Sequence, residues 1–178
     1  MVHSASRPFR MSSPHATGEP PESMYDASPQ NHRMDDAERR AAIRDYIERD
    51  PFARSLGAVI EALEPGYCRA SLTVSPAMIN FHGTTHGAVV FALADIALAG
   101  ASNSGGQTTF ALSINVAFLA TTAVGDRLVA EAREEHASGP TGLYDLIVRR
   151  EGTGEGIARA QAMTYRKKEW FVPPGGGA

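Results

Sequence analysis

The chain has 178 residues, of which 43% are hydrophobic and 21% are charged, and it carries a formal net charge of −3 at pH 7. This size and composition suit one globular domain, with or without a tail. The 17 Lys and Arg residues are balanced by 20 Asp and Glu residues and form no dense run. The charge pattern therefore argues against nucleic acid or an anionic membrane as the partner and favours a small molecule.

Residues 1–33 contain much Ser, Pro, His and Gly and few aliphatic side chains, a composition typical of disordered segments. They also lack the continuous apolar stretch of a secretory signal. The single cysteine, Cys68, has no second cysteine with which to form an internal disulfide, and we interpret it as a buried thiol. We therefore expect a disordered tail over residues 1–33 and a cytoplasmic protein.

A helix is predicted over residues 34–49, where apolar residues recur at helical spacing between Arg and Glu side chains. Asp35 and Asp36 offer side-chain oxygens that can cap the first turn. Pro51 disfavours helical backbone in the residue before it, so the helix is expected to end there.

Alternating apolar and polar residues over 58–63 and 67–74, separated by a Glu-Pro-Gly turn, predict a β-hairpin. A long and almost wholly apolar helix follows at about His86–Ser102, and an Asn-Ser-Gly-Gly run ends it. Four further β-segments come next, divided by turn-forming residues. Their predicted bounds are Thr108–Phe118, Arg127–His136, Gly142–Arg150 and Ile157–Lys167.

This order of elements indicates an α+β fold. A helix that is apolar on nearly every side must be covered on most of them, and a curved, mostly antiparallel sheet of five to six strands can surround it. We divide the chain into the tail, the helix over 34–49, a main domain over 50–168 and a flexible C-terminal tail over 169–178. The apolar run is interrupted by Asp95 and is shorter than the roughly 20 residues of a transmembrane helix, so we expect no membrane partner.

The start of the long helix is a candidate site for a carbonyl oxygen or an anion. Small residues and glycines precede it, which leaves the first backbone N–H groups and the positive end of the helix dipole accessible. Gly87 has no Cβ to block an approaching atom, so its N–H suits an oxyanion donor.

The other candidate is Asp95, a carboxylate inside the apolar run. It lies eight residues beyond Gly87, which is roughly 12 Å along a helix. If both groups act on one carbonyl, they must come from two subunits whose helices run antiparallel across a twofold axis. Small residues share the face of Asp95 and would allow close approach of two helices. They are Ala88, Ala92, Ala99 and Ser102.

Other interpretations stay open for these residues. Asp95 could be an ordinary carboxylate on a solvated face, although its apolar neighbours disfavour this. Asn80 could be only a turn residue. His82 and His86 are four residues apart, but the glycines around them disfavour a helical metal-binding pair, so we expect no metal.

A further set of motifs runs through about residues 51–168. It comprises Leu56-Gly57, Asn80, His86-Gly87, Leu93-Ala94-Asp95, Asn103-Ser104, the run from Ser113 to Leu119, and Gly125-Asp126. With these motifs the sequence resembles the PaaI-type hotdog-fold acyl-CoA thioesterases. The resemblance implies a helix wrapped by an antiparallel sheet, dimers whose two sheets join and usually pair into tetramers, and an active site at the dimer interface.

The resemblance also implies roles for five residues. Asp95 would be the general base or nucleophile, and Asn80 would position the water or the thioester. The N–H of Gly87 would polarise the thioester carbonyl, His86 would line the same pocket, and Ser113 would lie near the attacking water. CoA would be part of the substrate, and no other cofactor would be needed.

Two positions depart from the family pattern. Ala88 stands where the family often has a second glycine, which leaves the Gly87 N–H usable. Ala120-Thr121 stands where the family usually has Arg-Pro, and this removes a positive group that could contact the CoA phosphates. The departure puts the preference for CoA over an acyl-carrier protein in question.

These observations favour a homodimeric or homotetrameric thioesterase that hydrolyses acyl-CoA, with aromatic esters of the phenylacetyl type as one candidate among the acyl groups. One alternative is a hotdog hydratase or dehydratase, which would need a catalytic His that the helix of Asp95 lacks. Another is a non-catalytic acyl-CoA-binding protein or sensor. A DNA-binding sensor is disfavoured because the helix over 34–49 has no second recognition helix and no basic stripe beside it.

Overall fold

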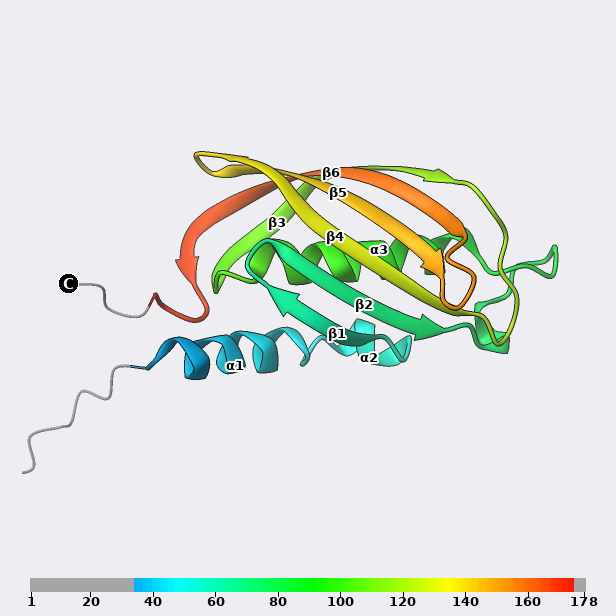
Figure 1. Cartoon of the computed structure of the whole chain (residues 1–178), viewed down its shortest axis with the longest axis horizontal. Helices are drawn as coiled ribbons and strands as arrows, with labels where there is room; N and C mark the ends of the chain where they lie inside the picture. Colours follow the sequence, from blue (N-terminus) through cyan, green and yellow to red (C-terminus); the bar gives the residue numbers. More distant parts are fainter. Residues whose placement is uncertain (1–33, 175–178) are drawn as a thin grey trace, which may run out of the picture. The chain divides into compact units, whose positions relative to one another are not determined.

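The computed structural model describes residues 34–174 (Figure 1). The predicted tail over 1–33 and the last four residues of the predicted C-terminal tail lie outside the described residues. Within the described part, a long central helix lies against a six-stranded sheet. The predicted α+β architecture is thereby confirmed.

Helix α1, Asp36–Ile47, starts two residues later than predicted, and its N-cap is Asp35, one of the two expected capping residues. The carboxylate of Asp35 accepts hydrogen bonds from the backbone N–H groups of Ala37 and Glu38, both at 2.8 Å, and the Glu38 carboxylate accepts in return from the N–H of Asp35 at 2.9 Å. This capping box satisfies donors that the helix itself leaves open. The helix ends two residues earlier than predicted.

Helix α2, Pro51–Ser55, is absent from the sequence prediction. Asp50 caps it by accepting hydrogen bonds from the N–H groups of Phe52, at 2.8 Å, and Ala53, at 3.3 Å. Pro suits the first position of a helix because it has no N–H to leave unsatisfied. The Asp-Pro pair that follows α1 therefore starts a second helix.

The sheet contains the six predicted strands in the order β1-β2-β4-β5-β6-β3, and every neighbouring pair is antiparallel. Strands β1 and β3 form its two edges. The bounds are β1 (Val59–Glu64), β2 (Tyr67–Thr73), β3 (Gln107–Phe118), β4 (Arg127–Ser138), β5 (Thr141–Arg150) and β6 (Gly156–Trp170). A short 3-10 helix, η1 (Pro76–Met78), lies in the predicted loop after β2.

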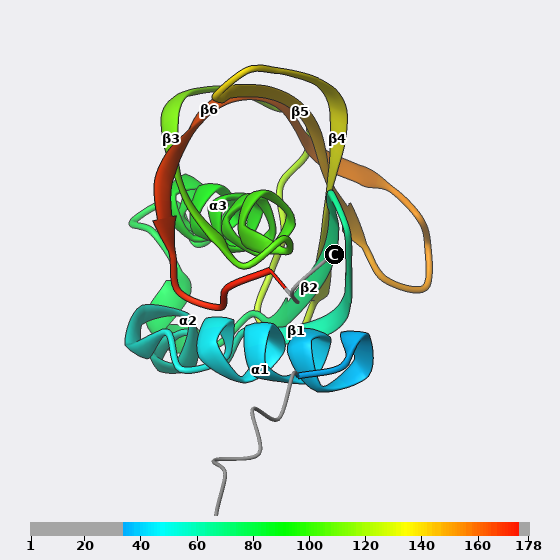
Figure 2. The same ribbon diagram turned by 90° about the vertical axis from the view of Figure 1, so that its left-hand side faces the viewer.

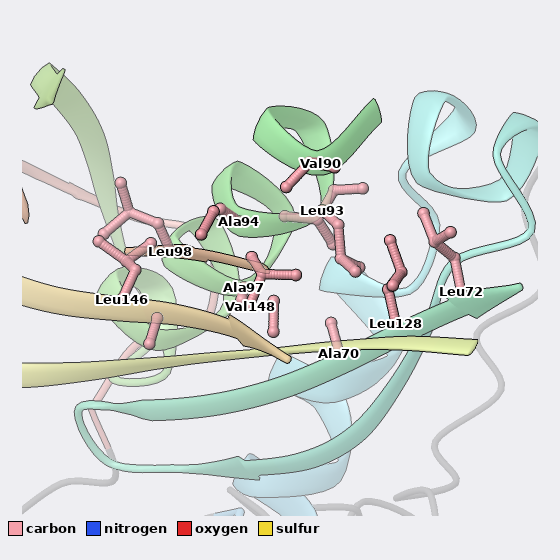
Figure 3. Close-up of a cluster of buried hydrophobic side chains, with 14 of the residues drawn as sticks. Ala70, Leu72, Val90, Leu93, Ala94, Ala97, Leu98, Leu128, Leu146 and Val148 are labelled. Carbon is pink, nitrogen blue, oxygen red and sulfur yellow. The ribbon is translucent and has the colours of Figure 1, made fainter. Parts of the chain in front are cut away.

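Helix α3, Gly87–Asn103, runs inside the curve of the sheet, as Figure 2 shows in a view along the helix. Of its 17 residues, 11 are buried. Its apolar side chains meet those of β2, β4 and β5 in the core (Figure 3). The labelled members are Ala70, Leu72, Val90, Leu93, Ala94, Ala97, Leu98, Leu128, Leu146 and Val148. No helix within residues 34–174 combines the length and apolar character needed to cross a membrane.

Helix α3 approaches the sheet closely at Gly100. A Cβ added at Gly100 would lie 2.4 Å from the Sγ of Cys68 on β2, so only glycine fits this contact. Cys68 is fully buried, and burial raises the pKa of its thiol to about 12. The prediction of a buried cysteine is confirmed, and its thiol is held in the unreactive neutral form.

The C-terminal segment corrects one expectation. A flexible tail is predicted from residue 169, but β6 continues to Trp170 and Val172 is buried. The N–H groups of Phe171 and Val172 both donate to the carbonyl of Gly106, at 3.0 and 3.1 Å. Burial of the apolar Val172 side chain therefore holds in place a segment that its Pro and Gly content predicts to be flexible.

Candidate active site

The loop before α3 is shaped by Asn80. Its Oδ1 accepts hydrogen bonds from the N–H groups of His82, at 2.9 Å, and Thr84, at 3.3 Å, while its Nδ2 donates to the Thr84 hydroxyl at 3.0 Å. The N–H of Asn80 also donates to the carbonyl of Thr84 at 2.8 Å. This pattern is that of an Asx turn, which matches the turn interpretation of Asn80. The polar atoms of this side chain are occupied within its own loop.

His86 is the N-cap of α3. Its ring Nδ1 accepts a hydrogen bond from the N–H of Ala88 at 3.1 Å, and its backbone N–H donates to the carbonyl of Met78 at 2.8 Å. The carbonyl of His86 accepts from the N–H of Val89 at 2.9 Å. A neutral ring that accepts at Nδ1 carries its proton on Nε2. His86 is exposed, so this Nε2–H is available to a ligand.

The same cap leaves one amide open at the start of the helix. The N–H groups of Ala88 and Val89 are used by His86, whereas no group among residues 34–174 accepts a hydrogen bond from the N–H of Gly87. The ring of Phe118, at the end of β3, lies 3.4 Å from the position of a Cβ at Gly87. Several open amides are expected here from the sequence, but among the described residues the first turn leaves only the N–H of Gly87 without an acceptor.

Two threonines fix the approach to α3. The Thr122 hydroxyl donates to the Thr85 hydroxyl at 2.6 Å, and the N–H of Thr85 donates to the carbonyl of Thr122 at 2.9 Å. Both side chains are buried. Sequence reasoning missed this pair, because nothing in the sequence relates two threonines 37 positions apart.

Asp95 lies in the middle of α3 and is half-buried. Within residues 34–174, no group donates a hydrogen bond to its carboxylate or pairs with its charge, and its oxygens are not sealed from solvent. Burial raises the pKa of Asp95 above its ordinary value, and the negative charge of Asp50 raises that pKa further. An unpartnered carboxylate of raised pKa on a buried helix is a candidate general base.

Sequence reasoning missed the electrostatic effect of Asp50 on the pKa of Asp95. Its carboxylate caps α2, and it acts on Asp95 from 45 positions earlier in the chain. The Asp-Pro pair indicates the start of a helix, but nothing in the sequence indicates that this start lies near Asp95 in the folded chain.

Ser113 lies on the edge strand β3, exposed and paired with Met163 of β6. Its neighbour Ile114 packs against the core, so Ser113 points to the outer face of the sheet. A single chain therefore does not gather the five predicted residues. Three of them, Asn80, His86 and Gly87, lie at the start of α3, and Asp95 lies roughly 12 Å further along the helix axis. Ser113 lies on the outer face of the sheet, whereas α3 packs against the inner face.

The small-residue face of α3 is narrower than predicted. Ala88 and Ala99 are exposed, but Ala92 and Ser102 are already buried within the chain. Two helices could still approach along the exposed stripe, which also carries Asp95. In the described part of the chain, no group of three or more His, Cys, Asp or Glu side chains is arranged to hold a metal ion.

The comparisons with known proteins identify the family. Residues 82–157 match the model of the Thioesterase superfamily. A putative esterase from Archaeoglobus fulgidus is 32% identical over 132 residues, which cover 74% of this chain and 85% of that protein. The acyl-coenzyme A thioesterase PaaI of Escherichia coli K12 is 37% identical over 101 residues, which cover 57% of this chain and 72% of that protein.

The structures agree with the sequences. A structure of E. coli PaaI, described as a protein of the phenylacetic acid degradation operon, has a TM-score of 0.71 and 30% identity to this chain. The match covers 74% of this chain and 95% of that one. The fold and these relatives thus define a hotdog-fold thioesterase. The chain belongs to the Thioesterase superfamily and is similar to its PaaI-type enzymes.

Proposed function

We propose that this thioesterase hydrolyses acyl-CoA to a free acid and CoA, at a site completed by a second copy of the chain. The observation that carries the proposal is the pair formed by the unpartnered carboxylate of Asp95 and the open N–H of Gly87 on one helix. The PaaI of E. coli is named an acyl-coenzyme A thioesterase, which supports CoA esters as the substrate class.

In the proposed reaction, the raised pKa of Asp95 suits it to accept a proton from water as that water attacks the thioester carbon. The alternative is direct attack by the carboxylate, which would form an anhydride that water then hydrolyses. In both cases negative charge develops on the carbonyl oxygen, and the N–H of Gly87 would stabilise it. The CoA thiolate leaves without strong protonation because a thiol is already fairly acidic, with an ordinary pKa of about 8.5.

The other predicted residues take supporting parts in this proposal. The Nε2–H of His86 would donate to the carbonyl or to the departing sulfur. Asn80 would hold the loop that presents Gly87, and Ser113 would act near the water only if another copy brings it there. The reaction as proposed needs no metal or other cofactor, since CoA is part of the substrate.

A second copy is needed because of distance. The carboxylate and the N–H must both reach one carbonyl within hydrogen-bond range, yet within one chain they lie roughly 12 Å apart along α3. Two α3 helices in antiparallel contact would place Asp95 of one copy opposite Gly87 of the other. Further pairing of dimers into a homotetramer remains an expectation from the resemblance.

Strand β3 supports this dimer. Among the described strands it pairs only with β6, so its other edge carries backbone groups that a second β3 could pair with. Large apolar side chains are also exposed on β3 and on the loop before α3, and a partner would cover them. They are Phe81, Phe110, Leu112, Phe118 and Leu119, with Phe81 92% exposed.

The finer proposal is that aromatic acyl groups, such as phenylacetyl, are among the substrates. The similar E. coli protein PaaI comes from the phenylacetic acid degradation operon, which supports an aromatic acyl group. In this chain the ring of Phe118 lies beside the open N–H of Gly87. An aromatic ring at that position could stack on a ring in the substrate.

The experiment is release of free thiol from acetyl-, hexanoyl-, phenylacetyl- and decanoyl-CoA, measured together with the shift in melting temperature that each ester causes. Hydrolysis of at least one ester, lost in Asp95→Asn, is the expected result. A melting shift without thiol release would indicate a binding protein or sensor with a dead site. Conversion of enoyl-CoA to hydroxyacyl-CoA would indicate the hydratase alternative.

A further inference from the structure

A cavity of about 600 Å³ lies beside the C-terminal half of α3. The residues to which the proposed reaction assigns roles do not line it. Its lining comes from four places: the junction of α1 and α2, the exposed stripe of α3, the start of β3 and the segment after β6. The members that matter here are Tyr46, Asp50, Ala99, Asn103, Phe110 and Phe171. A volume of this size is typical of small-molecule sites.

The cavity lies one helical turn from Asp95, the proposed general base. Ala99 lies four residues beyond Asp95 on α3, and residues four apart on a helix are neighbours on one face, with Cβ atoms about 5–6 Å apart. Asp50 lines the cavity and also acts electrostatically on Asp95. In the proposed dimer, the thioester carbonyl would lie at the end of the cavity nearest Asp95.

The walls offer apolar contacts. The Asn103 side chain donates from Nδ2 to the carbonyl of Thr109 at 3.0 Å and accepts at Oδ1 from the Thr109 N–H at 2.9 Å, so its polar atoms join α3 to β3. The carboxylate of Asp50 is used as the cap of α2. Arg49 also lines the cavity, and its guanidinium pairs with the carboxylate of Asp45. The apolar part of the lining includes the rings of Tyr46, Phe110 and Phe171 and the methyl group of Ala99.

One wall is a clamp of two aromatic rings. Tyr46 of α1 stacks on Phe171, with ring centroids 4.5 Å apart and an interplanar angle of 21°. The Phe171 N–H donates to the carbonyl of Gly106, and the Nε of Arg39 donates to the carbonyl of Pro173 at 2.9 Å. The clamp therefore joins the first described helix to the last described segment, and both of its rings line the cavity.

We infer that this cavity receives the acyl group of the substrate, and that the stacked pair of Tyr46 and Phe171 limits the length of the acyl group that fits. The inference rests on the proposed function. A short or aromatic acyl group has the size and apolar character that the lining fits, and stacked or edge-on contact with the rings would favour an aromatic one.

The test measures kcat/KM for acetyl-, hexanoyl-, phenylacetyl- and decanoyl-CoA with the full chain and three variants. Phe171→Ala and Tyr46→Ala open the clamp, and each is expected to raise the decanoyl-to-acetyl ratio by about tenfold, the scale of one or two apolar contacts in a specificity pocket. Ala99→Leu fills the cavity and is expected to lower the ratio of phenylacetyl to acetyl by about as much.

Phe52→Ala is the matched control, because Phe52 is an exposed phenylalanine of α2 that does not line the cavity. It should leave all ratios unchanged, and retained hydrolysis of acetyl-CoA shows that each variant is folded. Unchanged ratios in all three cavity variants would overturn this inference while the proposed function stands. A wild-type chain that hydrolyses none of the four esters would overturn the proposed function, and this inference with it.

Discussion

Two carboxylates in this molecule have opposite surroundings. Asp95 on α3 has no partner within residues 34–174, and burial raises its pKa. Glu61 on β1 is held by two guanidinium groups, with Arg69 and Arg127 each at 2.6 Å, and its pKa is lowered to about 2. The hydrogen bond from the Ser71 hydroxyl is the largest cause of that lowering, and it outweighs the opposing effect of burial.

Glu61 belongs to a network on one end of the sheet. Arg69 also pairs with Glu131 at 3.1 Å, and Arg127 also pairs with Glu151 at 2.8 Å. Each of these charges already has an opposite charge beside it, so the network is suited to holding β1, β2 and β4 in register. Within residues 34–174 Asp95 has no such neighbour, so its carboxylate is available to accept a proton in the proposed reaction. The number of partners, rather than burial alone, separates the stabilising carboxylate from the one proposed as the general base.

The strongest test of this contrast is Asp95→Asn. Turnover of acyl-CoA should fall by about 10²–10⁴, the usual contribution of a general base. The melting temperature should stay the same or rise, because the change removes a half-buried charge that has no partner. Thiol release and thermal unfolding measure the two effects. Lost activity together with a strongly lowered melting temperature would make Asp95 a structural residue like Glu61.

The open amide is tested by Gly87→Pro. Proline suits the first turn of a helix, and the preceding His86 has φ −63° and ψ 131°, values that a residue before proline adopts readily. The change removes the N–H, and kcat should fall by about 10²–10³, as for loss of one oxyanion-hole donor.

Gly87→Ala is the control for this variant, because it keeps the N–H and adds only a Cβ, at 3.4 Å from the ring of Phe118. It should retain most of the activity. Equal losses in both variants would mean that the small size of Gly87, and not its N–H, is what the site requires.

Glu61→Gln should lower the free energy of unfolding at pH 7 by about 1 kcal/mol, near the upper end for partly exposed ion pairs. A carboxyl whose pKa falls from 4.5 to about 2 on folding contributes stability above pH 4.5, and that stability is lost as the pH falls toward 2. The wild-type and variant curves should therefore converge over this window in urea unfolding. The exposed Glu135→Gln is the control, and a difference that persists unchanged to pH 2 would contradict the role given to Glu61.

The smallest effect is expected from Asp50→Asn. Asparagine still caps α2, but the negative charge that helps to raise the pKa of Asp95 is gone. The basic form of Asp95 should then persist to lower pH, so the acidic limb of the kcat/KM profile should move to lower pH. The shift should be partial, because burial is the larger cause and remains. Asp36→Asn, far from α3 in sequence and at the start of α1, should leave the limb in place.

The regular elements of this fold could be predicted from the sequence because their signals are local. Alternation marked the strands, and the apolar run of α3 required a sheet around it. The elements that were not predicted have physical causes. Helix α2 has only five residues, and the chain after β6 is held in place because Val172 is buried against residues far from it in the sequence. Local patterns carry no information on either.

The site was predictable only in part. The His-Gly pair and the isolated carboxylate of Asp95 could be read directly from the sequence. The use of the Ala88 amide by His86, the charge of Asp50 beside Asp95 and the stack of Tyr46 on Phe171 could not, because they depend on contacts between distant segments or on a side-chain rotamer. The dimer is inferred from a distance along one helix, and that inference was possible from the sequence alone.

The cap formed by His86 also limits what this residue can do for the reaction. To accept a proton at Nε2, the neutral ring would have to carry its hydrogen on Nδ1, where it would face the N–H of Ala88 instead of accepting from it. Base chemistry at His86 would thus disrupt the first turn of the helix that presents Gly87. In this arrangement the ring donates hydrogen bonds to a ligand and does not take up a proton at Nε2, which agrees with the proposal that Asp95 acts as the general base.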